Sequence, residues 1–553
     1  MRKSKLKKLC AVAVASSLAM SFCMGCGSDE KKESNGGSDS AVAQDLVFNV
    51  GAEPETIDPT LNTTVDGGTI IVNSFEGLMR LDETDTPQPA AAESVDESED
   101  GLVYTFHLRK DGKWSDGKPV VAGDFAYSWI RALTKSTGAE YSYQLFYIKN
   151  AEKYYNGEAA VEDLGIKVID DYTLEVTLES PTSYFEALTA FPTLMPLRED
   201  IVTADPDGWA MDPDAIVCNG PFKLTEYNMK DSYVYEKNDE YWDADSVKLD
   251  TVKYTFIGED DTAYASLKSG EFDMINSVPT EEIENGKNEG LVTIHPYLGT
   301  YFFCFNVGKN DSYPEEVQKA LENKLVRQAL SIAIDRKGIV EKVTKGDQVP
   351  AYSFVPKGIM NPDGNDFADK EYYNAETPDL EKAKELLAEA GYPNGEGLPT
   401  LELMYNSEGA HKDICEVIQQ SWAQIGVNVE LTNQEWAVFV NTRQNGEYEI
   451  ARHGWIADYT DPMTFLDMWV TGGGNNDAGF SNPEYDSLIA QAKVETDVDK
   501  RAEMMRKAED ILMDEMPVLP IYYYTSVNAA QPNVKGVIYS ALGQVTVKTA
   551  YKE

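Results

Sequence analysis

Residues 401–459 read LELMYNSEGAHKDICEVIQQSWAQIGVNVELTNQEWAVFVNTRQNGEYEIARHGWIADY, and this stretch decides the fold class. Short apolar and β-branched runs predict strands over residues 401–405, 427–431 and 448–455. The segments between them predict helices around residues 411–424 and 436–444. Strands that alternate with helices indicate a parallel sheet with helices on its faces. We therefore predict a mixed α/β protein.

The same reading extends to both sides of this stretch. Ordered structure is expected from about residue 46, and strands are predicted over residues 103–108 and 172–178. Thr377-Pro378 predicts a helix start with Thr377 as N-cap and Pro378 at the first position, and Gly391 predicts its end. A chain of 553 residues exceeds the usual size of a single core, so two or three domains are expected.

The first 25 residues have the pattern of a secretory signal peptide. Five Lys or Arg residues precede an apolar run over residues 9–20, which is too short to span a bilayer. Cys26 directly follows the small residue Gly25, and this pairing resembles the lipobox of bacterial lipoproteins, in which the cysteine carries a diacylglyceryl group. We predict a signal peptide over residues 1–25, lipidation of Cys26 and a flexible polar tether over residues 26–44. Ordinary cleavage into a free secreted protein remains the alternative.

The charge of the chain excludes two classes of partner. It carries 94 acidic and 48 basic residues and a formal net charge of −46, and loss of residues 1–25 removes five further positive charges. Such a surface repels phosphate backbones and anionic head groups. We predict no nucleic-acid partner and membrane contact through the lipid anchor only, on the extracytoplasmic face of the cell membrane.

The sequence carries no complete catalytic or metal-binding motif. Residues 112–119 nearly match a phosphate-binding loop, but Pro119 occupies the position of the magnesium-binding Ser or Thr. The four histidines have no metal-ligand spacing, and Cys218, Cys304 and Cys415 are interpreted as buried small residues. We predict no enzyme activity, no cofactor and no metal. A hydrolase with a carboxylate pair remains a remote alternative, because so acidic a chain offers many pairs.

Several strings in a fixed order carry a resemblance to a known family. They are EPETIDP at 53–59, FEGL at 75–78, YTFHLRKDGKWSDGKPVVAGDFAYSW at 104–129, NGPFKL at 219–224, ALSIAIDR at 329–336 and ARHGWIADYTDP at 451–462. With these segments the chain resembles the peptide-binding branch of the family 5 extracellular solute-binding proteins, which deliver ligands to ABC importers. The similarity runs over roughly residues 45–550.

The resemblance implies a fold of the periplasmic-binding-protein type, in which two lobes close over a ligand. The first lobe would contain a core domain from residues 45–79, 219–298 and 526–553 and an inserted second domain over residues 80–218. The other lobe would span residues 299–525, with the hinge near Gly299 and Thr525. Gram-negative relatives carry cysteines at the positions of Gly299 and Ile456, and the loop over residues 63–68 also differs from theirs.

The resemblance also implies short peptides and the permease subunits of an ABC importer as partners, and we expect a monomer. Every peptide has one ammonium, one carboxylate and a repeating backbone, so a receptor for many sequences must fix the termini with opposite charges. In the family, the aspartate of the string matched by Trp455-Ile456-Ala457-Asp458-Tyr459 binds the ammonium. Asp458 also follows a predicted strand end, where open α/β sheets bind ligands.

The other site residues come from the same match. The groups implied for the carboxylate of peptides of different length, treated as cations, are Arg452, Arg443, His411 and Lys309. The implied aromatic walls of the side-chain pockets are Trp455, Trp436 and Tyr143. The alternative that keeps the fold is another cargo, such as a signalling peptide, an oligosaccharide or a nickel chelate.

Overall fold

The structure, a computed structural model, describes residues 42–308, 313–407 and 409–553. The predicted signal peptide, Cys26, most of the predicted tether and Lys309 lie outside the described residues. The chain from Ala43 to Glu553 forms one compact unit. In the part of the chain that is described, no helix has both the length and the apolar character needed to cross a membrane.

The described residues contain one large sheet of eleven strands, in which parallel and antiparallel pairs are mixed. In spatial order the strands are β15 (Val429–Gln434), β14 (Leu401–Asn406), β16 (Ile450–Ile456), β12 (Val292–Phe305), β17 (Val518–Ala530), β11 (Met274–Ile275), β1 (Asp45–Asn49), β10 (Thr251–Thr255), β9 (Ser232–Lys237) and β8 (Phe222–Asn228), with β13 (Val349–Pro350) paired to β17. This architecture confirms the predicted mixed α/β class.

The stretch quoted at the outset folds as predicted, with small shifts at its boundaries. Strand β14 pairs in parallel with both β15 and β16. Helices α12 (His411–Ala423) and α13 (Trp436–Gln444) connect these strands, and both pack against β14 and β15. Strand β16 pairs on its other side with β12 in the antiparallel sense, which a local reading of the sequence does not predict.

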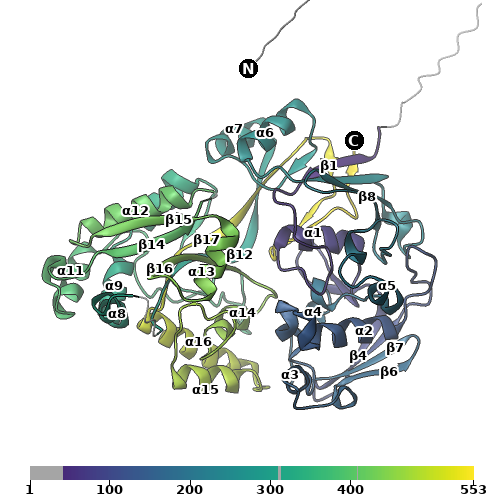
Figure 1. Cartoon of the computed structure of the whole chain (residues 1–553), viewed down its shortest axis with the longest axis horizontal. Helices are drawn as coiled ribbons and strands as arrows, with labels where there is room; N and C mark the ends of the chain where they lie inside the picture. The colour runs from purple at the N-terminus through teal and green to yellow at the C-terminus, as the bar shows by residue number, and fades with distance from the viewer. Residues whose placement is uncertain (1–41, 309–312, 408) are drawn as a thin grey trace, which may run out of the picture. The chain divides into compact units, whose positions relative to one another are not determined.

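Two long strands run through the middle of the large sheet. β12 and β17 pair with each other and connect the strands around β14 to those around β1 (Figure 1). The second half of β12 is fully buried, as expected for a central strand covered on both faces. The β12–β17 register shifts between Pro296 and Thr300, and Gly299 lies directly opposite Ile456 of β16. The irregularity therefore coincides with the predicted hinge at Gly299.

A second sheet lies in the segment predicted as an inserted domain. Its order is β4 (Ala92–Glu97), β5 (Val103–Leu108), β7 (Thr173–Thr177) and β6 (Ile166–Asp170). β5 and β7 confirm the two predicted strands, and helix α2 (Ala122–Leu133) packs against β6 and β7. The remaining strands pair as β2 (Met79–Leu81) with β3 (Pro87–Pro89), β18 (Val534–Lys535) with β21 (Tyr551–Lys552), and β19 (Ile538–Tyr539) with β20 (Val545–Thr546).

Helices cover the sheets and contribute to the core. Those not yet named are α1 (Val65–Ser74), α3 (Ala151–Tyr155), α4 (Phe185–Leu188), α5 (Glu199–Ala204), α6 (Asp260–Ser269), α7 (Ile283–Glu289), α8 (Glu315–Glu322), α9 (Lys324–Ile332), α10 (Arg336–Gly338), α11 (Leu380–Glu389), α14 (Met463–Leu466), α15 (Pro483–Ala492) and α16 (Val498–Glu515). Cys218, Cys304 and Cys415 are buried free thiols, as predicted.

The predicted N-cap of α11 is wrong by two residues. The helix begins at Leu380, and the carboxylate of Asp379 accepts the amide of Lys382 at 2.9 Å. The side chain of Asn374 accepts the amide of Thr377 at 3.1 Å, so Thr377 belongs to the preceding turn.

Candidate functional site

Asp458 lies on the loop that leaves β16, and three hydrogen bonds fix this loop. The amide of Ala457 donates to Leu298 at 2.8 Å, and the amide of Asp458 donates to the hydroxyl of Thr464 in α14 at 3.1 Å. The indole nitrogen of Trp455 donates to the same hydroxyl at 3.4 Å. The carboxylate of Asp458 therefore projects from a rigid segment of backbone.

The carboxylate of Asp458 has no cationic neighbour within ion-pair distance among the described residues. The hydroxyl of Tyr143, which comes from the segment 80–218, donates to it at 3.3 Å. Burial, and then the nearby charge of Asp467, raise the pKa of Asp458 to about 7, and the bond from Tyr143 opposes this shift. The pKa of Asp458 in the folded protein lies above that of an unfolded aspartate. Ionisation of Asp458 therefore lowers the free energy of unfolding as the pH rises from about 4 to 7. The site therefore holds a carboxylate that lacks a counter-charge.

Arg452 is an uncompensated cation six residues earlier in the chain. It lies on β16 with its guanidinium carbon 5.0 Å from the ring centroid of Tyr301, and its Nη2 donates to the hydroxyl of Tyr524 at 3.2 Å. Its Nε is buried, and none of the described residues forms a hydrogen bond with it. Across the described ranges, no carboxylate lies within 4.0 Å of this guanidinium. Arg452 thus retains N–H groups that form no hydrogen bond within the described residues.

Glycine in β16 makes room for these aromatic partners. Gly454 lies opposite Tyr301 of β12, on the same face of β16 as Arg452. A Cβ atom at Gly454 would clash with the hydroxyl of Tyr524. The absence of a side chain here lets Tyr524 reach over the strand to Arg452.

His411 is placed beside Arg452, and its role in binding a peptide carboxylate stays a prediction. It begins α12, and its Nδ1 lies 3.0 Å from the hydroxyl of Tyr301. Burial, and then the charge of Arg452, lower its pKa well below the ordinary value for histidine. The imidazole is therefore neutral at pH 7, and Tyr301 joins it to Arg452 in one cluster.

Arg443, in the last turn of α13, already has a counter-charge. Its Nε donates to Asp477 at 2.7 Å, and Nε2 of His453 lies 3.3 Å from the same carboxylate. All three side chains are buried. A role for Arg443 in binding a ligand carboxylate stays a prediction. Such a carboxylate would compete with Asp477 for the guanidinium.

The three predicted aromatic walls differ in their surroundings. Tyr143 contacts Asp458 directly, and Trp455 shares the Thr464 hydroxyl with the Asp458 amide. Trp436 is the first residue of α13, is 45% exposed and stacks on Phe439 at 6.2 Å. The structure thus brings Tyr143 and Trp455 to Asp458. The roles of all three as pocket walls stay predictions.

Sequence reasoning missed the partners that surround the charged residues. Tyr301 and Tyr524 hold Arg452, and Asp477 holds Arg443. The aromatic runs TYFFCF at 300–305 and YYY at 522–524 mark two strands in the sequence. No local signal places those strands beside β16.

In the described residues, no group of three or more His, Cys, Asp or Glu side chains is arranged to hold a metal ion. The chemistry available at Asp458 and Arg452 is that of charge pairing and hydrogen bonding. Asp458 offers oxygens to a cation, and Arg452 offers N–H donors to an anion. The arrangement is suited to a guest that carries both charges.

Comparisons with known proteins identify similar chains. The model of a family described as bacterial extracellular solute-binding proteins, family 5, matches residues 86–477. An oligopeptide-binding protein, OppA, of Bacillus subtilis is 39% identical over 527 residues, which are 93% of this chain and 94% of that protein.

Solved structures agree with this comparison. The substrate-binding domain of an oligopeptide ABC transporter from Bacillus anthracis matches with a TM-score of 0.83 and 36% identity, over 93% of this chain and 99% of that one. OppA of Listeria monocytogenes bound to peptide matches with a TM-score of 0.81 and 32% identity, over 92% and 99%.

Proposed function

Because the chain belongs to the family 5 extracellular solute-binding proteins of bacteria, we propose that it binds short peptides and delivers them to the permease subunits of an ABC importer. Membership in the family confirms the resemblance read from the sequence. It also confirms that the chain is a substrate-binding protein and not an enzyme. The proposal concerns its cargo and the way in which that cargo is held.

The observation that carries the proposal is the pair of unneutralised charges at Asp458 and Arg452. Each is held among protein groups with no counter-ion in the described part of the chain, an arrangement that costs free energy unless a guest neutralises it. A zwitterion whose ammonium meets Asp458 and whose carboxylate meets Arg452 would satisfy both. A neutral sugar could hydrogen-bond to both groups but would neutralise neither charge.

The spacing of the two residues supports a guest of a few amino acids. Arg452 and Asp458 are six positions apart along β16 and the loop that follows it, so their Cα atoms are at most about 20 Å apart. An extended peptide spans about 3.3–3.6 Å per residue. Allowing for the reach of both side chains, we propose peptides of about three to five residues.

Contacts between the two predicted lobes support closure over the guest. Tyr143 of the inserted segment bonds Asp458, and the hydroxyl of Tyr147 lies 3.0 Å from that of Tyr459. Tyr184 stacks on Tyr459 with ring centroids 4.2 Å apart. We propose that these contacts form as the lobes close and that the irregular β12–β17 register near Gly299 is the hinge.

Calorimetric titration of the purified protein tests the cargo. We expect binding of mixed tri- to pentapeptides and no detectable binding of an oligosaccharide mixture or a nickel chelate. A protein that binds the sugar or the chelate and ignores the peptides would overturn the proposal. The relatives support the expected result, since one solved structure of this family is described as bound to peptide.

The second part of the proposal is a lipid anchor on Cys26, with the protein on the extracytoplasmic face of the membrane. A Cys26→Ser variant expressed in a bacterial host should move from the membrane fraction to the soluble exported fraction, because two acyl chains are needed for stable anchoring. Immunoblotting of the fractions measures this. Retention of the variant in the membrane would contradict the role of Cys26.

A further inference from the structure

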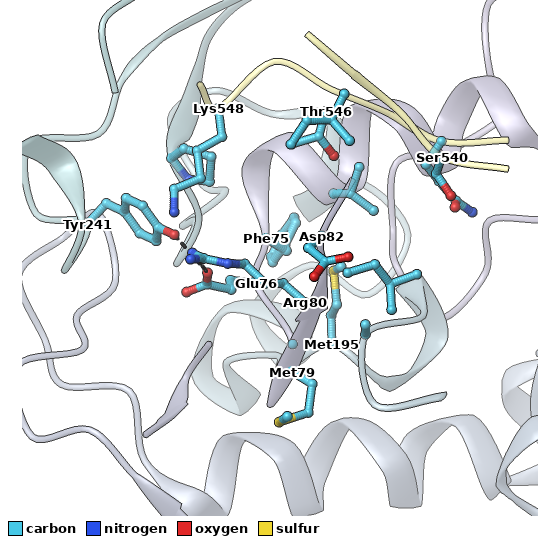
Figure 2. Close-up of a pocket in the computed structure, with 17 residues that line it drawn as sticks. Phe75, Glu76, Met79, Arg80, Asp82, Met195, Tyr241, Ser540, Thr546 and Lys548 are labelled. Atoms are coloured by element: carbon cyan, nitrogen blue, oxygen red, sulfur yellow. Dashed lines mark hydrogen bonds and ion pairs between the residues drawn. The ribbon is translucent and has the colours of Figure 1, made fainter. Parts of the chain in front are cut away.

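A cavity lies far along the chain from the residues of the proposed peptide site. Its walls come from α1, β2 and the segments around Met195, Tyr241 and residues 538–548. Its lining contains none of the described residues of the segment 299–525, which supplies Asp458 and Arg452. Figure 2 shows this cavity, with Glu76 and Arg80 next to each other and Tyr241 and Lys548 near them.

The acidic groups of the cavity are already satisfied by the protein. Glu76 accepts hydrogen bonds from Tyr241 at 2.7 Å and from the indole of Trp242 at 2.6 Å. Asp82 accepts the amides of Thr84 and Thr86 at 2.9 and 3.1 Å, and it further accepts the Thr84 hydroxyl and the Gln88 side chain. No acceptor oxygen of these two carboxylates needs a guest.

Lys548 is satisfied as well, whereas Arg80 is not. The ammonium of Lys548 donates to Asp243 at 2.5 Å. The guanidinium of Arg80 lies 3.5 Å from Glu76 and 3.9 Å from Asp243, which are ion-pair distances, but within the described residues it makes no hydrogen bond. Its Nη1 is buried without a hydrogen-bond partner. Among the charged side chains of the lining, Arg80 therefore has unused hydrogen-bonding capacity, and a guanidinium can only donate.

The rest of the wall is largely apolar. Phe75, Met79 and Met195 are buried with at most 4% of their surfaces exposed. Further apolar surface comes from Val72, Leu81, Ala190, Pro221 and Ile538, and the polar side chains of Ser540, Gln544 and Thr546 occupy the remainder of the wall. The free volume is about 80 Å³. Since a water needs about 10–15 Å³ on this measure, the space fits a guest of roughly five to eight non-hydrogen atoms. An apolar body of that size with one acceptor group matches the walls.

We propose that this cavity binds a small aliphatic monocarboxylate of about five to eight non-hydrogen atoms, whose carboxylate accepts hydrogen bonds from Arg80. The planar guanidinium fits a carboxylate with two parallel N–H···O bonds. The apolar walls exclude water from the hydrocarbon part of the guest. The site is separate from the proposed peptide site and does not depend on it.

Ligand-observed NMR with pentanoate and the purified protein tests the proposal. We expect saturation transfer to pentanoate, with a Kd of about 1 mM or tighter for so small a guest. Pentan-1-ol and pentylammonium, which have the same body and no carboxylate, should bind at least tenfold more weakly. Equal binding of the alcohol or the amine would overturn the assignment of a carboxylate, and absence of transfer to all three would overturn the site.

Two variants with an expected loss of binding and two control variants locate the binding. Arg80→Gln should weaken pentanoate binding at least tenfold, and Val72→Phe, which narrows the cavity and keeps Arg80, should also weaken it. Arg506→Gln removes a partly exposed arginine that pairs with Asp369 elsewhere and should change nothing. Asp458→Asn should leave pentanoate binding intact, which separates this site from the peptide site. Unchanged binding in Arg80→Gln, or loss of binding in Asp458→Asn, would refute the placement.

Discussion

Replacing Asp458 with asparagine should lower the affinity for an unmodified tripeptide about 100-fold or more, equivalent to roughly 3 kcal/mol. The substitution keeps the shape of the side chain and the hydrogen bond from Tyr143 but removes the charge that pairs with the ammonium. The ammonium would then be buried without a counter-ion, which accounts for most of the loss. Calorimetric titration of both proteins measures the change.

The pH dependence gives this prediction a second readout. With a pKa of about 7, Asp458 is largely protonated below neutrality, so wild-type affinity should rise with pH up to about 7, by at most tenfold per pH unit. Peptide amines lose their proton with a pKa of about 8, so affinity should fall again at higher pH. The rising limb should be absent in Asp458→Asn. An N-acetylated peptide that binds the wild type as tightly as the free peptide would refute the role of Asp458.

Replacing Arg452 with methionine should have two effects of opposite sign. Peptide affinity should fall about 10- to 100-fold, because the carboxylate loses a charged partner. The ligand-free protein should become more stable by about 1 kcal/mol or more, because an uncompensated cation is replaced by an apolar side chain of similar length. Calorimetric titration and the thermal midpoint measure the two effects.

Arg443→Met is the matched control for this change. Arg443 pairs with buried Asp477, so its loss leaves that carboxylate with only His453 and should lower the thermal midpoint.

Amidation of the peptide C-terminus should weaken binding to the wild type but not to Arg452→Met. A loss of stability in Arg452→Met would show that the guanidinium is already compensated in the free protein and would contradict this account of the site.

The elements that could be predicted from the sequence are those set by local patterns. The β-α-β stretch around β14 and the strands β5 and β7 have apolar periodicities within a few residues, and they fold as expected. The predicted N-cap of α11 is wrong, because Asp379 caps the helix and Thr377 belongs to a turn held by the side chain of Asn374. The antiparallel pairing of β16 with β12 joins residues about 150 positions apart, and no local pattern encodes it.

The residues of the site also differ in whether a local sequence pattern or tertiary packing determines them. Asp458 and Arg452 lie in one matching string, so the sequence predicted both as site residues. Their protein partners Tyr143, Tyr301 and Tyr524 come from three distant segments. The ionisation of His411 depends on burial and on its distance from Arg452, which only the folded chain sets. The pairing of Arg443 with Asp477 likewise depends on tertiary packing.

Both proposed anchor residues come from a single strand, β16, and the loop that leaves it. The spacing between them is therefore fixed by covalent geometry and does not change with domain movement. A guest can form both terminal contacts on one rigid surface before Tyr143, which belongs to the segment 80–218, contacts Asp458. We expect association to be second order and fast, with closure as a later unimolecular step that controls how long the guest is retained.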